Sequence, residues 1–113
     1  MYSDQSDTIR VIAAISKRYQ KSETFYWYAY HDEPQRKFLS EAKNGMVIFG
    51  MTDQESAFAV PYDLLEKHWH NLYETTKKNG HVYKHIYIYL VNGKFYLRIR
   101  EKGTEIELEK YGI

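Results

Sequence analysis

The sequence contains no cysteine. A chain without thiols can form neither a disulfide framework nor a thiolate metal site, and it has no cysteine nucleophile. Cysteine-free chains fit a reducing compartment, so we expect the protein to be cytoplasmic. Proline and glycine are also scarce, with 2 and 6 residues among 113, and no low-complexity linker divides the chain. We therefore expect a single domain over residues 1–113, with residues 1–6 loose.

Neither sign of charge is in excess, since 16 basic residues face 15 acidic ones. Domains that bind polyanions through bulk charge usually carry a clear basic excess, so any contact with nucleic acid must be local. The apolar stretch near the N-terminus is too short and too interrupted for a signal peptide or a membrane span. We therefore expect no membrane association.

Catalytic and metal-binding patterns are also lacking. His81 and His85 lie on one face of a predicted strand, but four positions separate them by roughly 13 Å. His68 and His70 diverge around a predicted helix, so they cannot share one ion. The aspartates mostly stand where caps and turns need them, and no phosphate loop or nucleophile motif occurs. We expect no enzyme activity, no metal and no cofactor.

Aromatic residues, in contrast, are abundant, and 12 residues are tyrosine. Tyrosine combines a large stackable surface with a hydroxyl and little rotamer entropy, which suits a contact surface. The densest segment, residues 24–30, predicts a strand, and we interpret Phe25 and Trp27 as its core residues. The other face and the loop that follows then supply candidate binding residues: Tyr26, Tyr28, Tyr30, His31 and Arg36.

The pair Asn92-Gly93 predicts a two-residue hairpin turn, because a type I′ turn needs a positive φ at both central positions. Counting outward from it, one face of the hairpin is wholly apolar and should be core: Ile86, Ile88, Leu90, Phe95, Leu97 and Ile99. The other face alternates aromatic and cationic groups, which could stack on bases and hold phosphates. These candidates are His85, Tyr87, Tyr89, Tyr96, Arg98 and Arg100, whereas Lys84 belongs to the opposite face.

The two arginines also have a structural interpretation. If Lys102-Gly103 turns the chain into a third strand, Arg100 faces Glu105 and Arg98 faces Glu107. Cross-strand ion pairs of this kind are ordinary and contribute roughly 0.2–1 kcal/mol each. The sequence leaves open whether the arginines are neutralised in this way or bind a ligand.

The remaining segments predict about three helices and a further hairpin. The helices are expected from Asp7 to Tyr19, from Asp32 to about Ala42, and from Asp63 to Thr76, the last with Trp69 as a core anchor. The hairpin joins strands at residues 46–51 and 56–60. This order predicts an α+β domain with a curved antiparallel sheet, or alternatively a partly closed pseudobarrel.

Four segments carry a resemblance to a known group of proteins: FYWYAYHDEPQRKFL, MVIFGMTDQESAFAVPYDLL, NLYETT and HVYKHIYIYLVNGKFYLRI. The general sequence pattern of these segments resembles a small accessory domain of prokaryotic restriction and helicase-type defence proteins. The resemblance implies a DNA-recognition domain of the pseudobarrel kind that serves restriction-modification or phage defence. Cleavage would then come from a larger nuclease or helicase protein.

We therefore expect a non-enzymatic domain that binds nucleic acid, with DNA as its ligand. One alternative is a protein-interaction module, a phage or anti-phage factor, that uses the tyrosine-rich sheet face. Another is a reader of modified bases with an aromatic pocket made by Trp27, Tyr28 or Tyr30. The residues expected to bind nucleic acid are Arg98, Arg100, Tyr87, Tyr89, Tyr96, His85, Tyr28, Tyr30, His31 and Arg36.

Overall fold

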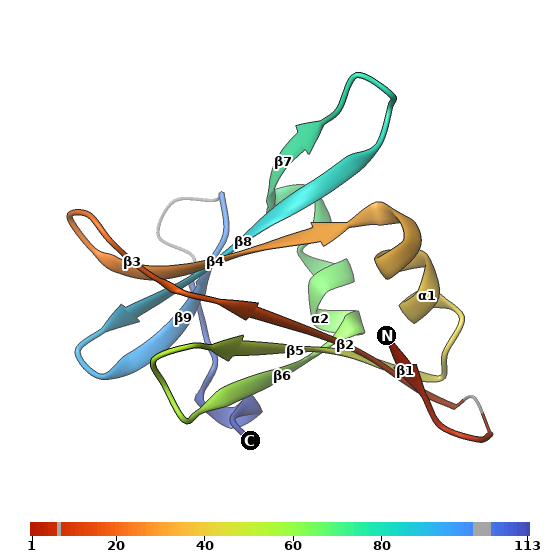
Figure 1. The fold of residues 1–113 in the computed structure, drawn as a ribbon, viewed down its shortest axis with the longest axis horizontal. Helices are drawn as coiled ribbons and strands as arrows, with labels where there is room; N and C mark the ends of the chain where they lie inside the picture. The colour runs from red at the N-terminus through yellow and green to blue at the C-terminus, as the bar shows by residue number, and fades with distance from the viewer. Residues whose placement is uncertain (7, 101–104) are drawn as a thin grey trace.

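The computed structural model describes residues 1–6, 8–100 and 105–113, and it shows an α+β fold made mostly of strands (Figure 1). The strands form two sheets. We call the first the mixed sheet, with the order β1 (Tyr2–Ser3), β2 (Ile9–Ser16), β5 (Asn44–Met51) and β6 (Ala57–Pro61). Within it β2 and β5 are parallel, and the other pairs are antiparallel.

The second sheet is antiparallel throughout and we call it the antiparallel sheet. Its order is β10 (Glu105–Glu107), β9 (Lys94–Arg98), β8 (Val82–Val91), β4 (Thr24–His31) and β3 (Arg18–Gln20), and β7 (Tyr73–Thr76) also pairs with β8. One antiparallel sheet was predicted, but the mixed sheet was not. Among the described residues the two sheets do not close into a barrel.

Helical structure is shorter than the sequence predicts. The longest helix is α2 (Tyr62–Lys67), followed by the 3-10 turn η2 (Trp69–Asn71). The π-helical turn η1 (Asp32–Arg36) leads into α1 (Lys37–Ser40), and η3 (Glu109–Tyr111) lies near the C-terminus. The N-cap residues of η1 and α1, His31 and Arg36, form no side-chain capping hydrogen bond. None of the described helices is long and apolar enough to cross a membrane.

The predicted N-terminal helix is wrong, because residues 9–16 form β2. Ile12 and Ser16 are buried while Ala13 and Ile15 are exposed, which is the two-residue alternation of a strand. Likewise, the predicted helix to Thr76 stops at Lys67, and residues 73–76 form β7. The third expected helix, at residues 32–42, is present only as the π-helical turn and one short turn of α-helix.

Both predicted hairpins are confirmed. Asn92 and Gly93 have φ angles of 51° and 80°, as a type I′ turn requires, and Ile88 pairs with Leu97. The strands β5 and β6 also pair as expected. The β8–β9 pairing ends at Tyr87, because β7 occupies the rest of that edge of β8. Counting outward from the turn also predicts that Ile86 pairs with Ile99 and His85 with Arg100, but these pairs are not part of the ladder.

The third strand is present, with a register two residues from the predicted one. Glu105 pairs with Arg98, whereas Arg100 was expected in its place. A shift of two residues keeps every side chain on its predicted face, since the side-chain period of a strand is two. The predicted turn at Lys102-Gly103 lies outside the described residues.

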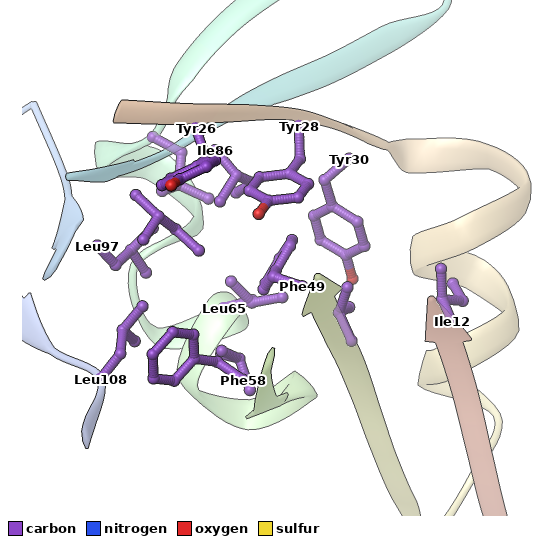
Figure 2. Close-up of a cluster of buried hydrophobic side chains, with 14 of the residues drawn as sticks. Ile12, Tyr26, Tyr28, Tyr30, Phe49, Phe58, Leu65, Ile86, Leu97 and Leu108 are labelled. Carbon is purple, nitrogen blue, oxygen red and sulfur yellow. The ribbon is translucent and has the colours of Figure 1, made fainter. Parts of the chain in front are cut away.

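The core lies between the inner faces of the two sheets (Figure 2). Tyr28 of β4 contacts Phe49 of β5, with ring centroids 4.7 Å apart. The helix α2 packs against β5 and β6 and adds Leu65 to the same cluster. From the predicted apolar face of the hairpin the fully buried side chains are Ile86, Ile88, Leu97 and Ile99, and Leu108 joins them.

The prediction of which residues of β4 face the core is wrong. Tyr26, Tyr28 and Tyr30 are 0%, 3% and 1% exposed, whereas Phe25 and Trp27 face outward and are half-buried. Two of these tyrosines occupy the core with their hydroxyl groups hydrogen-bonded. Tyr26 donates to Oδ1 of Asp53 at 2.8 Å, and Tyr28 donates to the backbone oxygen of Gly50 at 2.8 Å.

Candidate nucleic-acid interface

The outer face of the antiparallel sheet is lined with aromatic side chains. Because the even-numbered residues of β8 point into the core, its odd-numbered residues Tyr83, His85, Tyr87 and Tyr89 share the outer face and are half-buried. The neighbouring strand β4 adds Phe25 and Trp27 to this face.

Phe25 is the centre of a group of contacting rings on this face. It stacks on Tyr19 of β3 with centroids 5.3 Å apart, and it contacts Tyr89 at 5.3 Å and Tyr87 at 5.9 Å. Tyr73 of β7 meets Tyr87 edge-on at 5.6 Å. These mutual contacts hold the rings in place and leave part of each ring open to solvent.

The rings surround an open depression of about 350 Å³, which we call the aromatic hollow. Its apolar wall comes from three strands, and its polar rim comes from the β3–β4 turn and from β9. The residues that line it are Lys21, Ser22, Glu23, Phe25, Tyr73, Tyr87, Tyr89 and Arg98. The hollow therefore combines aromatic faces with cationic side chains, one of which, Arg98, is the centre of an ion-pair network.

Arg98 is held by two carboxylates. Its guanidinium lies 3.6 Å from the centroid of the Tyr89 ring, 2.8 Å from Glu23 and 3.0 Å from Glu105. Burial alone would lower the pKa of Arg98, but the hydrogen bond to Glu23 and the charge of Glu105 raise it. The guanidinium is thus compensated by cross-strand pairing, as the structural interpretation predicts, although Glu105 takes the place of Glu107.

His85 has a defined tautomer. Trp27 donates from Nε1 to Nδ1 of His85 at 2.9 Å, so Nδ1 carries no proton. Nε2 of a neutral ring then carries the proton and donates it to Oγ1 of Thr75 at 2.7 Å. Burial lowers the pKa of His85. This residue is therefore a neutral bridge between β8, β4 and β7.

Three further candidates lie on the outer face or at its margin. Tyr96 is half-buried and pairs with Tyr89 across the hairpin. His31 contacts the Tyr83 ring at 5.3 Å, and burial, followed by the charge of Lys77, lowers its pKa. Arg100 is exposed, and its backbone N–H donates to the carbonyl of Asn71 at 2.7 Å.

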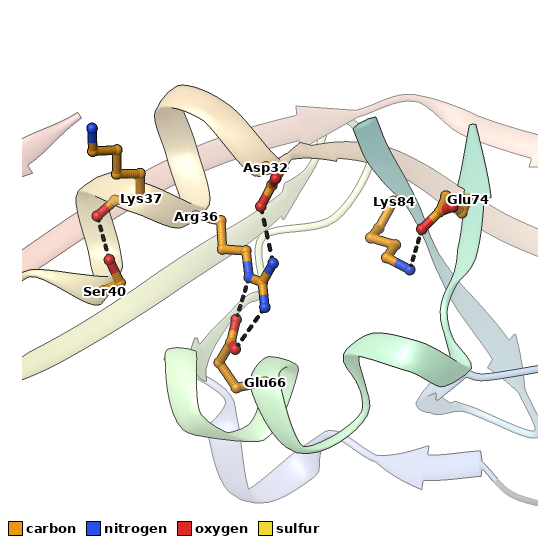
Figure 3. Close-up of polar contacts among 7 residues, drawn as sticks. All are labelled: Asp32, Arg36, Lys37, Ser40, Glu66, Glu74 and Lys84. Carbon is orange, nitrogen blue, oxygen red and sulfur yellow. Dashed lines mark hydrogen bonds and ion pairs between the residues drawn. The ribbon is translucent and has the colours of Figure 1, made fainter. Parts of the chain in front are cut away.

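Arg36 lies elsewhere, in an ion-pair cluster with Asp32 and Glu66 (Figure 3). Its guanidinium is 2.7 Å from Glu66 and 3.0 Å from Asp32, and it covers the Trp69 ring at 3.7 Å. The Lys84 ammonium lies 4.7 Å from the same ring. Trp69 itself is 6% exposed, so its predicted role as a core anchor is confirmed.

Tyr28 and Tyr30 are core residues, so the prediction that their rings face outward for binding is wrong. Trp27 lies on the opposite face of β4, so it does not line a pocket together with Tyr28 or Tyr30. The sequence had suggested none of Tyr19, Lys21, Glu23 and Tyr73 as site residues. The β-branched pair that follows Tyr73, Thr75-Thr76, is the signal that could have placed it on a strand.

Comparison with family models, curated proteins and solved structures finds no match for this chain. Among residues 1–6, 8–100 and 105–113, no group of three or more histidine or carboxylate side chains is placed to hold a metal ion.

Proposed function

We propose that this chain is a non-enzymatic domain that binds single-stranded or locally unpaired nucleic acid, with DNA as its ligand. The observation that carries the proposal is the aromatic hollow, where Phe25, Tyr87 and Tyr89 present ring surface beside Lys21. Sheets that bind single strands use such rings as platforms for bases, and nearby cations follow the backbone.

The geometry favours unpaired bases over duplex. A ring can stack on a base only when the face of that base is free, which does not occur inside a continuous helix. Lys21 and Lys17 supply positive charge near the rings, and the Lys17 ammonium lies 5.3 Å from the Tyr19 ring centroid. Because Arg98 is already compensated, we expect few phosphate contacts and a shallow dependence on salt.

The test is fluorescence anisotropy with a labelled single-stranded DNA, the RNA of the same sequence, and plain and modified duplexes, at about 50 and 200 mM salt. We expect single-stranded DNA to bind most tightly. Tyr87→Ala should lose ~1–3 kcal/mol of binding free energy with an unchanged salt slope. Tyr87→Phe is the matched control, because it keeps the ring and should keep the affinity. Equal affinity of Tyr87→Ala and wild type would refute the proposal.

The resemblance to accessory domains of restriction and helicase-type defence proteins supports the choice of DNA as ligand. In that setting the domain would hold an unpaired segment while a larger nuclease or helicase protein acts on it. The aromatic hollow requires no chemistry of its own for this role. Mixing the purified chain with DNA should therefore give a complex and leave the strand intact.

A protein-interaction module is the second candidate, favoured by the compensated state of Arg98. Tyrosine and arginine with paired charges are typical of interface hot spots. The same titrations separate the two candidates, because a protein partner should bind with little salt dependence while no oligonucleotide binds at either salt concentration.

A further inference from the structure

The outer face of the mixed sheet carries mostly apolar residues. The register places the residues of alternate positions on this face, opposite the core positions Ile12, Val47 and Val60. We call it the apolar face, and its members are Tyr2, Ile9, Val11, Ala13, Ile15, Met46, Ile48, Gly50, Ala57, Ala59 and Pro61, with one polar residue, Asn44, at the start of β5.

This face is not covered by the rest of the described chain. Ile15 is 71% exposed and Ile9 is 38% exposed, while Met46 and Ile48 are half-buried yet do not belong to the core cluster. No charged side chain occurs on the face among the described residues. The solvent-exposed face of a sheet normally carries polar residues. The apolar face is therefore suited to contact another surface.

The face has a projection at one end and a depression at the other. Ile15, near the end of β2, is 71% exposed, the highest fraction among the large apolar side chains of the face. At the start of β2, a depression of about 530 Å³ is lined by Ile9, Met46 and Ala59. Between them the face carries small residues such as Ala13, which let another surface approach closely.

We propose that the apolar face binds a second copy of this chain, with the mixed sheets packed face to face about a two-fold axis. If this two-fold axis lies between the two sheets and crosses the direction of β2, the β2 strands of the two copies are antiparallel to each other. It then places Ile15 of each copy over the depression beside Ile9 of the other. A face without charge can meet its own copy with no like-charge repulsion, so the contact is complementary to itself.

The apolar face is large enough for the dry centre of such a contact, and polar residues around it must supply the rest. Four strands side by side, with Ile9 and Ile15 six residues apart on one of them, give a footprint of roughly 400 Å². A typical stable interface buries about 800 Å² per partner, with a dry centre and a polar rim. The apolar face supplies the centre, and the polar residues that also line the depression supply a rim: Ser40, Lys43, Asn44 and Asp63.

Sedimentation velocity over a range of concentrations tests this proposal. Wild-type chain should be a dimer at micromolar concentration, and Ile15→Lys should raise the dimer dissociation constant roughly 30-fold or more, the effect typical of a hot-spot residue. The matched control is Val91→Lys, since Val91 is an exposed aliphatic residue in β8 of the other sheet. It should leave the dimer intact. Circular dichroism verifies that both variants fold.

Cross-linking gives a second readout that does not depend on disrupting the face. The chain has no cysteine, so Ala13→Cys introduces a single thiol near the proposed axis. A short bismaleimide should join two copies of Ala13→Cys efficiently and two copies of Val91→Cys poorly. A wild-type chain that stays monomeric, or equal cross-linking of both variants, would overturn the proposal. These outcomes concern only the mixed sheet, so they are independent of nucleic-acid binding at the aromatic hollow.

Discussion

The indole Nε1 of Trp27 donates a hydrogen bond to Nδ1 of His85 on the neighbouring strand, at 2.9 Å. The bond exists only while Nδ1 is unprotonated, and burial lowers the pKa of His85 in the folded chain. The pKa of an unfolded histidine is about 6.5, so the unfolded chain takes up this proton first as the pH falls. The contribution of this hydrogen bond to the free energy of unfolding should thus be complete above about pH 6.5 and decline as the pH falls below that value.

Thermal unfolding from about pH 7.5 to 5 measures this dependence. His85→Gln should reduce the pH dependence of thermal stability only in part, because His31 also has a lowered pKa and likewise reduces stability as the pH falls. An identical pH profile for wild type and His85→Gln would contradict the assignment of the neutral tautomer.

Two tyrosines of β4 should respond oppositely to the loss of their hydroxyl groups. The Tyr28 hydroxyl donates to the Gly50 carbonyl at 2.8 Å, whereas the Tyr30 hydroxyl is buried with no hydrogen-bond partner among the described residues. We expect Tyr28→Phe to lose about 1 kcal/mol and Tyr30→Phe to gain about 1 kcal/mol in the free energy of unfolding. Urea denaturation of both variants checks this, and equal losses would be inconsistent with the orphaned hydroxyl.

A side chain at Gly93 should destabilise the fold for a purely conformational reason. Its φ is 80°, yet a Cβ atom placed there would meet nothing within 4 Å. Gly93→Ala should therefore cost roughly 1–2 kcal/mol from backbone strain alone. Gly50→Ala is the control, because the added Cβ would lie at an ordinary 3.6 Å from the Ala14 carbonyl. Denaturant midpoints should separate the two variants clearly.

Lys84 and Glu74 form a pair in which one partner is buried. The Lys84 side chain is 4% exposed, its ammonium lies 2.8 Å from Glu74, and the hydrogen bond from Lys84 lowers the pKa of Glu74. Removing the carboxylate alone leaves a buried ammonium without its partner, whereas Lys84→Met removes the charge itself. We expect Glu74→Gln to destabilise the fold more than Lys84→Met does, as measured by thermal unfolding. The reverse order would mean that the ammonium reaches solvent.

The compensation of Arg98 gives a prediction for binding. Glu23→Gln removes one of its two carboxylates, so the arginine becomes available for a phosphate. Binding of single-stranded DNA should tighten, and the salt slope should steepen by about one phosphate. Arg98→Ala in the Glu23→Gln background should remove this gain, because the guanidinium that would contact the phosphate is then absent. Glu55→Gln makes the same change of charge at an exposed turn position and should alter neither quantity.

The C-terminal hairpin could be predicted because its signals are local. Asn92-Gly93 defines the turn, and the alternation from Tyr87 to Leu90 then determines which side chains are core. The position of Arg98 on the outer face followed from the same register. Its partner Glu105 did not, since β9 ends at Arg98 and β10 begins at Glu105, a longer separation than the two-residue turn that was predicted.

The segments that could not be predicted are apolar on both faces. From Ile9 to Ile15 the apolar residues satisfy a helical period and a strand period equally, and only pairing with distant β5 decides between them. In β4 every position is aromatic or small, so the sequence alone did not determine which face of the strand belongs to the core. The outcome depends on tertiary partners, because Asp53 accepts a hydrogen bond from Tyr26 inside the fold.

The parallel pairing of β2 with β5 also bears on how the chain folds. Between Ser16 and Asn44 the chain builds β3, β4 and α1, so these two strands can meet only after a long loop has closed. The β8–β9 hairpin needs only its turn at Asn92 and should form on a microsecond timescale. We therefore expect formation of the mixed sheet to limit the folding rate, which substitutions in β2 should slow more than substitutions in the hairpin.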